Sequence, residues 1–534
     1  MRSVYLSVWL ISVVAFSYAQ EWEWVRTGTS SLCAQGDGIT TDSNGYIYTI
    51  GGYEKTIRFN SSTTLSNYGG LYDDIFIVKY TPSHNLVWAK KAGSSGSDFG
   101  TEIKYKDGFI YLIGSISESG IMDTILLSDI PGMGLFFAKY TLDGNLVWVK
   151  QYGGDSSSVI PTDFYFHPSG DVAITGYYWG KFSAADDTFY SNGSTDFFVM
   201  LLDSLGNCKW AQSSGGYFSD YLRGVSMDSS GNVYAIGYFT YDILLDSVVL
   251  PSSNQAVLLT KFSNHGNLEW AEVIDGSWNN EGRVIAIMKE KLFIAGCYSY
   301  SINFDSIELD YVGGGDAFIA RYDLNGNCEW AKAIQSGYID NIYSLDPVDD
   351  DKMVFSGVFG DTLILDSDTL ISYGGEDIVV GKFDFNGNLI WTTAAGGWAS
   401  DHAFDLWADE FHNIYVTGDF YDVAHFGNID ASFKVECSDA FIAKLKDPDV
   451  GVDDEEFKEN EILIFPNPAS KSVVLKTNNS GQLSIMNLLG ERFIVDLNVS
   501  SGNSRLDISD LTSGIYLVVL KTTDSYTSQK LMVE

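Results

Sequence analysis

Four stretches of the sequence place an aromatic residue two or three positions before an aspartate or asparagine, and each stretch follows a glycine. An aromatic face can stack on the C–H groups of a sugar ring, while a carboxylate or amide beside it can bond the hydroxyl groups. This pairing predicts a shallow carbohydrate-binding surface. The eight candidate residues are Tyr217 with Asp220, Trp278 with Asn280, Tyr338 with Asp340, and Trp398 with Asp401.

Two other interpretations of these residues stay open. The aromatic rings could fill seams between neighbouring structural elements while the Asp or Asn caps a turn. Alternatively, Asp220, Asp340 and Asp401 could supply the acid and base of a polysaccharide-degrading enzyme, which needs two carboxyls about 5–9.5 Å apart. The six histidines show no metal-ligand spacing, and G-x-S-x-G and P-loop motifs do not occur. We therefore expect no metal, no cofactor and no assignable catalytic residue.

These candidates lie within a long internal repeat. A tryptophan recurs at intervals of 60 to 64 residues, and a glycine that ends a β-prone run follows each one 26 to 28 residues later. A fixed period of this size indicates a repeat architecture. The tryptophans are Trp24, Trp88, Trp148, Trp210, Trp270, Trp330 and Trp391, and the glycines are Gly51, Gly114, Gly176, Gly237, Gly296, Gly357 and Gly418.

Each copy predicts four strands. In the copy that begins near Trp210 the strands are 209–213, 222–227, 233–239 and 256–262, with Gly- and Asn-rich turns at two of the breaks. Seven such copies predict an all-β fold, a seven-bladed β-propeller over residues 20–446. The last copy stops at 440–445 without a Trp strand, and the first Trp strand, 21–25, has no partner before it. The N-terminal strand should therefore complete the seventh blade.

Two motifs recur inside the copies. A Gly-Asn-x-x-Trp turn precedes most of the tryptophans, and a D-x-x-G-N-V/I-Y-x-x-G run is represented by 228–237. In both, the copies resemble the SBBP-type β-propeller repeat of secreted bacterial proteins. Five copies also carry an aspartate before the third strand, which we expect to accept backbone N–H bonds in a turn. These aspartates are Asp74, Asp196, Asp316, Asp377 and Asp439.

The C-terminal part lacks the repeat. Residues 447–460 hold seven acidic residues and one lysine, which predicts a solvated linker. Short β-prone runs over residues 461–534 predict a small Ig-like β-sandwich. Four motifs there resemble the type A sorting domain of the type IX secretion system, which implies a Bacteroidetes-type bacterium and contact with the secretion translocon and its sortase. The motif residues are Pro466, Asn467, Pro468, Gly490, Gly514 and Tyr516.

Composition is consistent with export. Residues 1–19 read as a secretory signal peptide, and no later segment is apolar for long enough to form a membrane helix. A net charge of −38 disfavours nucleic acid as a partner. The odd number of cysteines, five, favours small buried side chains over a disulfide framework.

Together these observations predict a secreted or cell-surface binding or scaffolding protein, with a glycan or a protein as its extracellular ligand. The alternatives are a secreted propeller enzyme that acts on polysaccharide and a purely structural surface protein.

Overall fold

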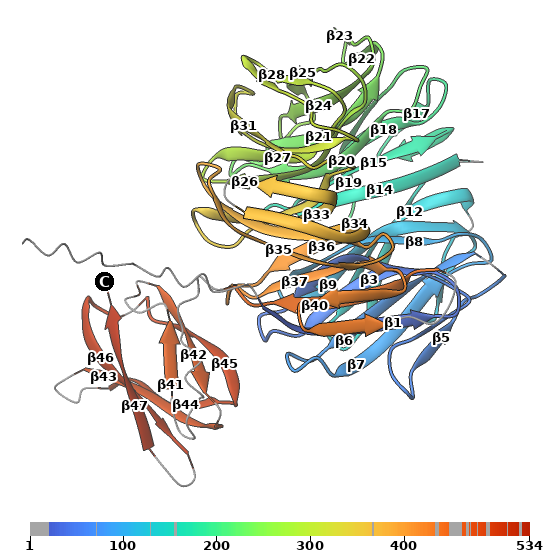
Figure 1. Cartoon of the computed structure of the whole chain (residues 1–534). Helices are drawn as coiled ribbons and strands as arrows, with labels where there is room; N and C mark the ends of the chain where they lie inside the picture. Colours follow the sequence, from blue (N-terminus) through green and yellow to red (C-terminus); the bar gives the residue numbers. More distant parts are fainter. Residues whose placement is uncertain are drawn as a thin grey trace, which may run out of the picture. The chain divides into compact units, whose positions relative to one another are not determined.

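The computed structural model describes residues 21–447 except 71, 129, 154–156, 366–367 and 433–436, and residues 462–533 except 466–468, 470, 478, 488–491, 510 and 523–525. Every regular element among these residues is a β-strand (Figure 1). The chain divides into two compact units, Met1–Pro448 and Asp449–Glu534. The predicted signal peptide lies outside the described residues.

Strand pairing groups the first unit into four-stranded antiparallel sets, here numbered in chain order. Set 1 contains β2 (Ala34–Thr41), β3 (Ile47–Glu54), β6 (Asp73–Tyr80) and β7 (Leu86–Gly93). Set 2 contains β8 (Phe99–Lys106), β9 (Phe109–Glu118), β12 (Ile130–Thr141) and β13 (Leu146–Tyr152). Set 3 contains β14 (Ser157–Phe166), β15 (Val172–Trp179), β18 (Asp196–Leu202) and β19 (Cys208–Ser214).

The remaining sets follow the same order. Set 4 contains β20 (Tyr221–Met227), β21 (Val233–Thr240), β24 (Gln255–Phe262) and β25 (Leu268–Ile274). Set 5 contains β26 (Asn280–Met288), β27 (Lys291–Tyr298), β30 (Asp316–Asp323) and β31 (Cys328–Ile334). Set 6 contains β32 (Asn341–Pro347), β33 (Lys352–Leu365), β34 (Asp368–Asp384) and β35 (Leu389–Gly397). Set 7 contains β36 (His402–Ala408), β37 (Ile414–Phe420), β40 (Asp439–Leu445) and β1 (Trp22–Ser30).

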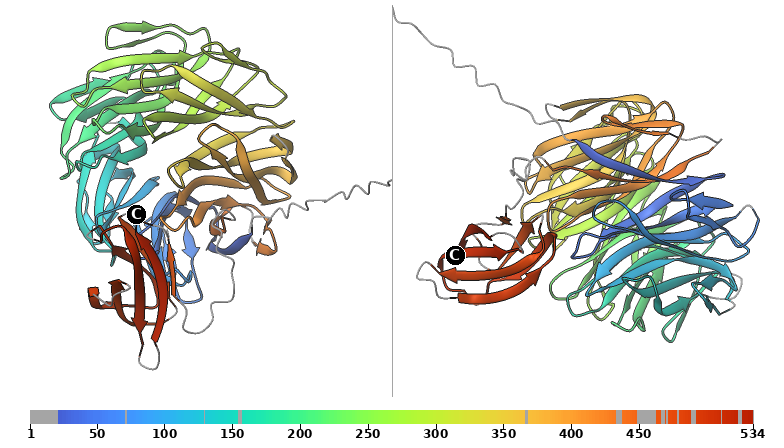
Figure 2. Two further views of the ribbon diagram at one scale, coloured as in Figure 1. Left: turned by 90° about the vertical axis from the view of Figure 1, so that its left-hand side faces the viewer. Right: turned by 90° about the horizontal axis from the view of Figure 1, so that it is seen from below.

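Set 7 joins the two ends of this unit. Its fourth strand is β1, which pairs with β40 so that Trp24 stands opposite Lys444, the pairing that the phase of the repeat predicts. The first strands of neighbouring sets contact one another in cyclic order, and β36 also contacts β2. The sheets accordingly stand around a common centre in the left-hand view of Figure 2. A hydrophobic cluster containing Trp24, Ile57 and Tyr415 fills the seam between sets 7 and 1.

Short hairpins between the second and third strands are additional to the predicted four. Set 6 forms its hairpin from the ends of β33 and β34. The hairpin of one set contacts the fourth strand of the preceding set, as in the pairings β4 with β1 and β10 with β7. The separate hairpins are β4 (Thr56–Arg58) with β5 (Thr64–Ser66), β10 (Ile121–Met122) with β11 (Ile125–Leu126), β16 (Lys181–Ala184) with β17 (Asp187–Tyr190), β22 (Ile243–Leu245) with β23 (Val248–Leu250), β28 (Ile302–Phe304) with β29 (Ile307–Leu309), and β38 (Val423–Phe426) with β39 (Ile429–Ser432).

The recurrent glycine is explained by a β-bulge. In every set the first strand carries one extra residue near its start, such as Arg223 between Leu222 and Gly224. The recurrent glycine lies opposite this bulge on the second strand. A Cβ added at Gly237 would stand 1.9 Å from the carbonyl oxygen of Tyr221, and the equivalent distances in the other sets are 1.8–2.2 Å. A larger residue would therefore push the two strands apart.

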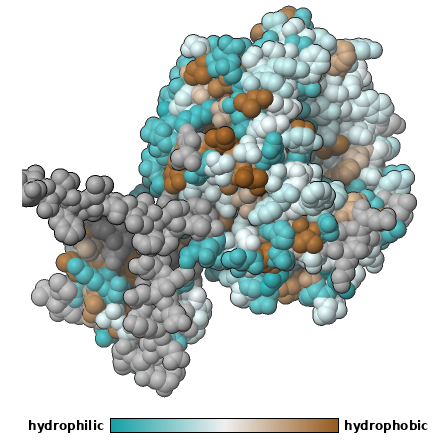
Figure 3. Space-filling view, viewed as in Figure 1, coloured by the Kyte–Doolittle hydropathy of each residue, from teal (hydrophilic) through white to brown (hydrophobic). Residues whose placement is uncertain are grey.

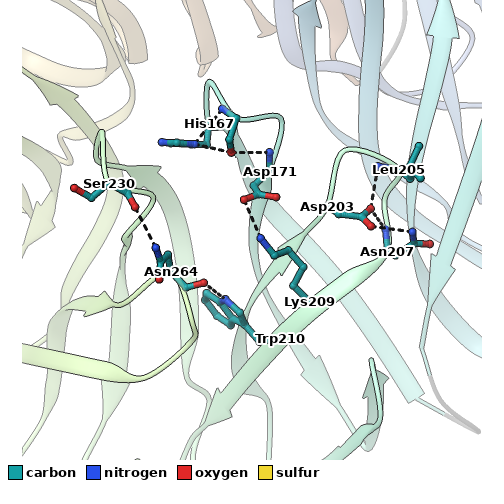
Figure 4. A network of polar contacts seen from close by, with 10 residues as sticks. His167, Asp171, Asp203, Leu205, Asn207, Lys209, Trp210, Ser230 and Asn264 are labelled. Atoms are coloured by element: carbon teal, nitrogen blue, oxygen red, sulfur yellow. Dashed lines mark hydrogen bonds and ion pairs between the residues drawn. The ribbon is translucent and has the colours of Figure 1, made fainter.

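The recurrent tryptophan packs against the turn of the next set. The indole of Trp210 donates to the carbonyl of Asn264 at 3.1 Å (Figure 4), and Gly266 in the same turn, at φ +83°, leaves room for the ring. Trp88 and Trp270 donate to the equivalent turns at 3.3 Å. In the turn that faces Trp24, His84 replaces the glycine and stacks on the indole with ring centroids 5.1 Å apart. The Gly-Asn-x-x-Trp motif therefore connects successive sets.

The aspartates before the third strand behave as expected for turn residues. Each is buried, and each accepts a backbone N–H bond at 2.6–3.2 Å. Asp439 accepts its bond from Ser30, so this contact also joins β40 to β1 within set 7.

The expectation that the cysteines form no disulfide is wrong for one pair. Cys33 and Cys437 are disulfide-bonded across 404 residues, at the seam between sets 7 and 1. The same positions between sets 3 and 4 hold Ser194 and Ser219, whose hydroxyls lie 2.9 Å apart. The disulfide thus replaces a hydrogen bond next to set 7, the set in which only strand pairing joins β1 to β40. Cys208, Cys297 and Cys328 are free thiols.

The first residue of the predicted linker belongs to the first unit. Asp447 is buried and forms an ion pair of 2.6 Å with the buried Lys382, and the indole of Trp391 donates to it at 3.4 Å. This corrects the predicted boundary, because a charged pair without solvent fixes the chain to set 6 up to this point. The rest of the linker lies outside the described residues.

The second unit has two sheets that share one hydrophobic core. The first sheet pairs β41 (Ile462–Phe465), β42 (Ser472–Thr477) and β45 (Gly502–Asp507). The second pairs β44 (Arg492–Val499), β43 (Gly481–Asn487), β46 (Gly514–Lys521) and β47 (Tyr526–Val533).

Candidate functional site

The four aromatic candidates, hereafter the rim aromatics, lie in equivalent loops. Each loop connects the fourth strand of one set to the first strand of the next, so all four lie at the same end of the strands. Their side chains are largely exposed, and this exposure contradicts the interpretation that they fill seams. The exposed fractions are 80% for Tyr217, 57% for Trp278, 51% for Tyr338 and 82% for Trp398.

The Asp and Asn partners of the rim aromatics are buried, whereas the carbohydrate-binding prediction requires them to be exposed. Asp220, Asn280, Asp340 and Asp401 are all fully buried. Asp220 accepts N–H bonds from Gly216 at 2.6 Å and Thr240 at 2.8 Å, and Asp401 accepts equivalent bonds from Gly397 and Tyr421. These side chains bond the loop backbone and do not reach a ligand. The structure thus agrees with the alternative in which the Asp or Asn caps a turn.

The same burial removes these aspartates from an enzyme mechanism. Burial raises the pKa of Asp220 to about 6 and those of Asp340 and Asp401 to about 7. Each carboxyl nevertheless bonds groups of its own loop, with Ser336 supplying both N–H and hydroxyl to Asp340. A general acid must reach the atom that it protonates, and these carboxyls lie beneath the loop backbone.

Backbone contacts between sets fix the loops that carry the rings. The carbonyl of Trp398 accepts from Gly375 at 3.2 Å, and the N–H of Asp401 donates to Glu376 at 2.7 Å. The neighbouring chain passes so close that a Cβ at Gly374 would stand 2.1 Å from the Trp398 carbonyl. The rings therefore extend from an ordered backbone, which reduces the entropy lost on ligand binding.

A cavity of about 610 Å³ lies among the first strands of all seven sets. Its lining includes the extra residue of every bulge, hereafter the bulge residues. The sequence pattern did not reveal them, because a bulge shifts the alternation of the strand by one residue. The bulge residues are Asp37, Thr101, Thr162, Arg223, Arg283, Tyr343 and Phe404.

The described residues also bear on three other kinds of feature: an apolar interface, a metal site and a membrane helix. In the face shown in Figure 3, apolar side chains of residues 21–447 form separate small patches among hydrophilic ones. Among the described residues, no group of three or more His, Cys, Asp or Glu side chains is placed to hold a metal ion. No helix of the described part of the chain is long and apolar enough to cross a membrane.

Two of the sorting-motif residues are described. Tyr516 is buried, its hydroxyl donates to the carbonyl of Thr512 at 2.7 Å, and its ring contacts Phe493. Gly514 begins β46. Both residues organise the turn at one end of the second sheet. Pro466, Asn467, Pro468 and Gly490 lie outside the described residues.

Comparison with protein families identifies the second unit. Residues 463–534 match the secretion system C-terminal sorting domain. This domain directs the chain to the type IX secretion machinery, and the protein is exported to the cell surface or the medium.

The chain as a whole has more distant relatives. An uncharacterized WD repeat-containing protein of Acanthamoeba polyphaga mimivirus is 24% identical over 488 residues, which cover 72% of this chain. The match spans about a third of that relative, 35% of its length. Similar solved structures include Drosophila Semaphorin 2a, at 9% identity and a TM-score of 0.34 over 96% of this chain and 98% of that chain. A virginiamycin B lyase of Staphylococcus aureus is also similar, at 10% identity and a TM-score of 0.25 over 62% and 95%.

Proposed function

We propose that the first unit is a seven-bladed β-propeller of the SBBP type that binds extracellular carbohydrate with its rim aromatics. The seven sets are its blades, β1 closes the ring, and the sorting domain is a β-sandwich. Residues 1–19 direct Sec export in a Bacteroidetes-type bacterium, and the sortase removes the tail at the surface. The protein acts by binding or scaffolding, without catalysis.

One observation carries this proposal. Four aromatic rings project 51–82% exposed from loops whose Asp or Asn side chains are buried. Exposed aromatic side chains that share one end of the strands offer apolar surface that a partner can cover. Aromatic faces suit the C–H faces of sugars, and loops fixed by backbone bonds present them without further ordering.

The test is binding of polysaccharides by the exported protein and its variants. Trp278→Ala combined with Trp398→Ala should weaken binding to the best ligand of a glycan array by about tenfold or more, because each ring contributes roughly 1 kcal/mol of stacking. Leu205→Ala is the matched control, since Leu205 is 64% exposed in a turn at the opposite end of the strands. Equal binding by the wild-type protein and the double variant would contradict the proposal and favour the alternative, a purely structural surface protein.

A further inference from the structure

The bulge residues differ between the two sides of the cavity. Sets 1 to 3 present Asp37, Thr101 and Thr162, whereas sets 4 to 7 present two arginines and two aromatic residues. The rim aromatics precede the first strands of the same four sets, five or six residues before each bulge. One half of the mouth therefore combines exposed rings with guanidinium and aromatic groups, in the order Arg223, Arg283, Tyr343 and Phe404.

Aromatic rings surround the two guanidinium groups. The Arg223 guanidinium carbon lies 5.0 Å from the ring centroid of Tyr221, 5.8 Å from that of Tyr238 and 5.9 Å from that of Tyr177. The Arg283 guanidinium lies 5.1 Å from the ring of Tyr343. Such rings hold a guanidinium in place by cation–π attraction without consuming its hydrogen-bond donors.

Donor capacity remains on both arginines. Among the described residues, the Nε atoms of Arg223 and Arg283 have no hydrogen-bond partner although solvent does not reach them. Arg283 forms one ion pair, 2.7 Å from its Nη2 atom to Glu281. Both guanidinium groups also act on the Cys297 thiol, whose pKa burial raises to about 11. The two arginines occupy equivalent positions in the neighbouring sets 4 and 5, and both line the cavity.

The carboxylates of the cavity are used by the framework. Asp163 accepts from the N–H of Val225 at 2.9 Å and pairs with Lys104 at 2.9 Å. Asp405 accepts from Ile39 at 2.9 Å, and Asp346 accepts from Ala408 at 2.8 Å. Each of these bonds joins the first strands of different sets. These three carboxylates thus connect the ring, whereas Glu102, which also lines the cavity, accepts from the N–H of Ile103 in its own strand. The arginine pair is only partly satisfied.

The wall opposite the arginines suits hydroxyl groups. Set 1 is across the ring from sets 4 and 5, so Asp37 faces the arginine side, with Thr101 of set 2 next to it. Thr162 of set 3 lies beside Arg223, because its hydroxyl donates to the carbonyl of Leu222 at 2.8 Å. Burial raises the pKa of Asp37 well above its usual value, and Gln35 donates to its carboxyl at 2.6 Å. A carboxyl that is protonated more readily than usual can both donate to and accept from a neutral hydroxyl.

On this arrangement we propose that the mouth of the cavity binds an acidic sugar residue, with its carboxylate on Arg223 and Arg283 and its hydroxyl groups toward Asp37 and the two threonines. The inference rests on the proposed carbohydrate function and specifies its ligand class. Flanking sugar rings of the chain stack on the rim aromatics. A guanidinium fork matches the planar carboxylate of a hexuronic acid, and the aromatic surroundings favour a sugar over a bare inorganic anion.

The test compares two probes that differ only in charge: the trisaccharide of galacturonic acid and its fully methyl-esterified form. Titration calorimetry with the mature full chain at low ionic strength should show the acid binding about tenfold or more tightly than the ester, as expected for charge-assisted bonds. Arg223→Gln and Arg283→Gln should each remove most of this preference and leave ester binding nearly unchanged. Arg223→Lys keeps the positive charge but not the two parallel N–H donors of a guanidinium group, so it should lose part of the preference for the acid.

Lys209→Gln is the matched control, because Lys209 pairs with Asp171 near the turns at the opposite end of the strands (Figure 4) and does not line the cavity. Unchanged melting temperatures exclude misfolding of the variants. Equal affinity for acid and ester, no binding of either, or an acid preference that survives both arginine substitutions would overturn the inference. If the Trp278→Ala and Trp398→Ala double variant loses ester binding, the proposed carbohydrate function is supported whatever the outcome for the arginines. If this variant keeps its affinities for the acid and for the ester, only the proposed role of the rim aromatics is overturned.

Discussion

At the scale of single residues, the recurrent glycines show how narrowly the fold restricts certain positions. Gly51 and Gly52 are adjacent in β3 and both buried. A Cβ at Gly51 would stand 2.1 Å from the carbonyl oxygen of Gln35, whereas one at Gly52 would meet nothing within 4 Å. Gly51 therefore has no room for a side chain, whereas its neighbour Gly52 does.

Gly51→Ala should therefore lower the free energy of unfolding by about 2–3 kcal/mol, the range for an overpacked site that must shift backbone. Gly52→Ala is the matched control and should change it by less than about 1 kcal/mol. Chemical denaturation of both variants measures the difference. Equal effects at the two positions would contradict the role assigned to the bulge.

The buried aspartates of the loops predict a dependence on pH. Burial raises the pKa of Asp220, Asp340 and Asp401 to about 6–7, so each contributes stability that is complete at low pH and lost as pH rises through these values. His402 acts in the same direction, since bonds to Asp419 and Glu376 outweigh its burial and raise its pKa to about 9. The first unit should melt at a higher temperature at pH 5 than at pH 8.

Set 5 supplies the control for this prediction, because Asn280 occupies the position of the aspartates and cannot titrate. Asp220→Asn should fold and should reduce the difference in melting temperature between the two pH values. A higher melting temperature at pH 8 in the wild-type protein would show that these carboxyls are ionised throughout.

At the scale of elements, the position of β1 depends on its pairing with β40, which lies at the other end of the first unit in sequence. It pairs with β40 and with β4, and Cys33 and Cys437 join the same seam covalently. Disulfides form in extracytoplasmic compartments, which agrees with export. Cys33→Ala with Cys437→Ala should cost about 2–5 kcal/mol, because the bond closes a very long loop of the unfolded chain.

Thermal melting with and without reductant measures this cost. The Ser194→Ala variant provides the comparison next to set 3, whose four strands are consecutive in the chain. The disulfide variant should lose hydrogen-exchange protection first in β1. Equal protection of β1 and β25 in that variant would indicate that strand pairing alone closes the ring.

The period of the sequence was sufficient to predict the strands and the partner of β1, because both follow from where each copy begins and ends. The disulfide was missed because Cys33 and Cys437 meet only after the ring closes. For Asp220 the sequence allows both a turn cap and a ligand contact, since it cannot distinguish a side chain beneath a loop from one above it. Arg223 and Arg283 gave no signal, because the bulges that direct them into the cavity have no fixed residue type.

At the scale of the whole molecule, the two compact units have separate cores and separate tasks. Removal of residues 461–534 should leave the first unit folded but retained in the periplasm, because the sorting domain lies only in that segment. Circular dichroism of the truncated protein and cell fractionation test the two parts of this prediction. Delivery of the truncated protein to the surface would contradict it.

The pairing of β1 with β40 also sets an order of events in time. The N-terminal strand is synthesised first, yet its partner follows only after some four hundred further residues. Until then β1 keeps an unpaired edge, and such edges promote aggregation. Synthesis and folding therefore run in opposite order here: the segment that is made first is among the last to complete its strand pairing.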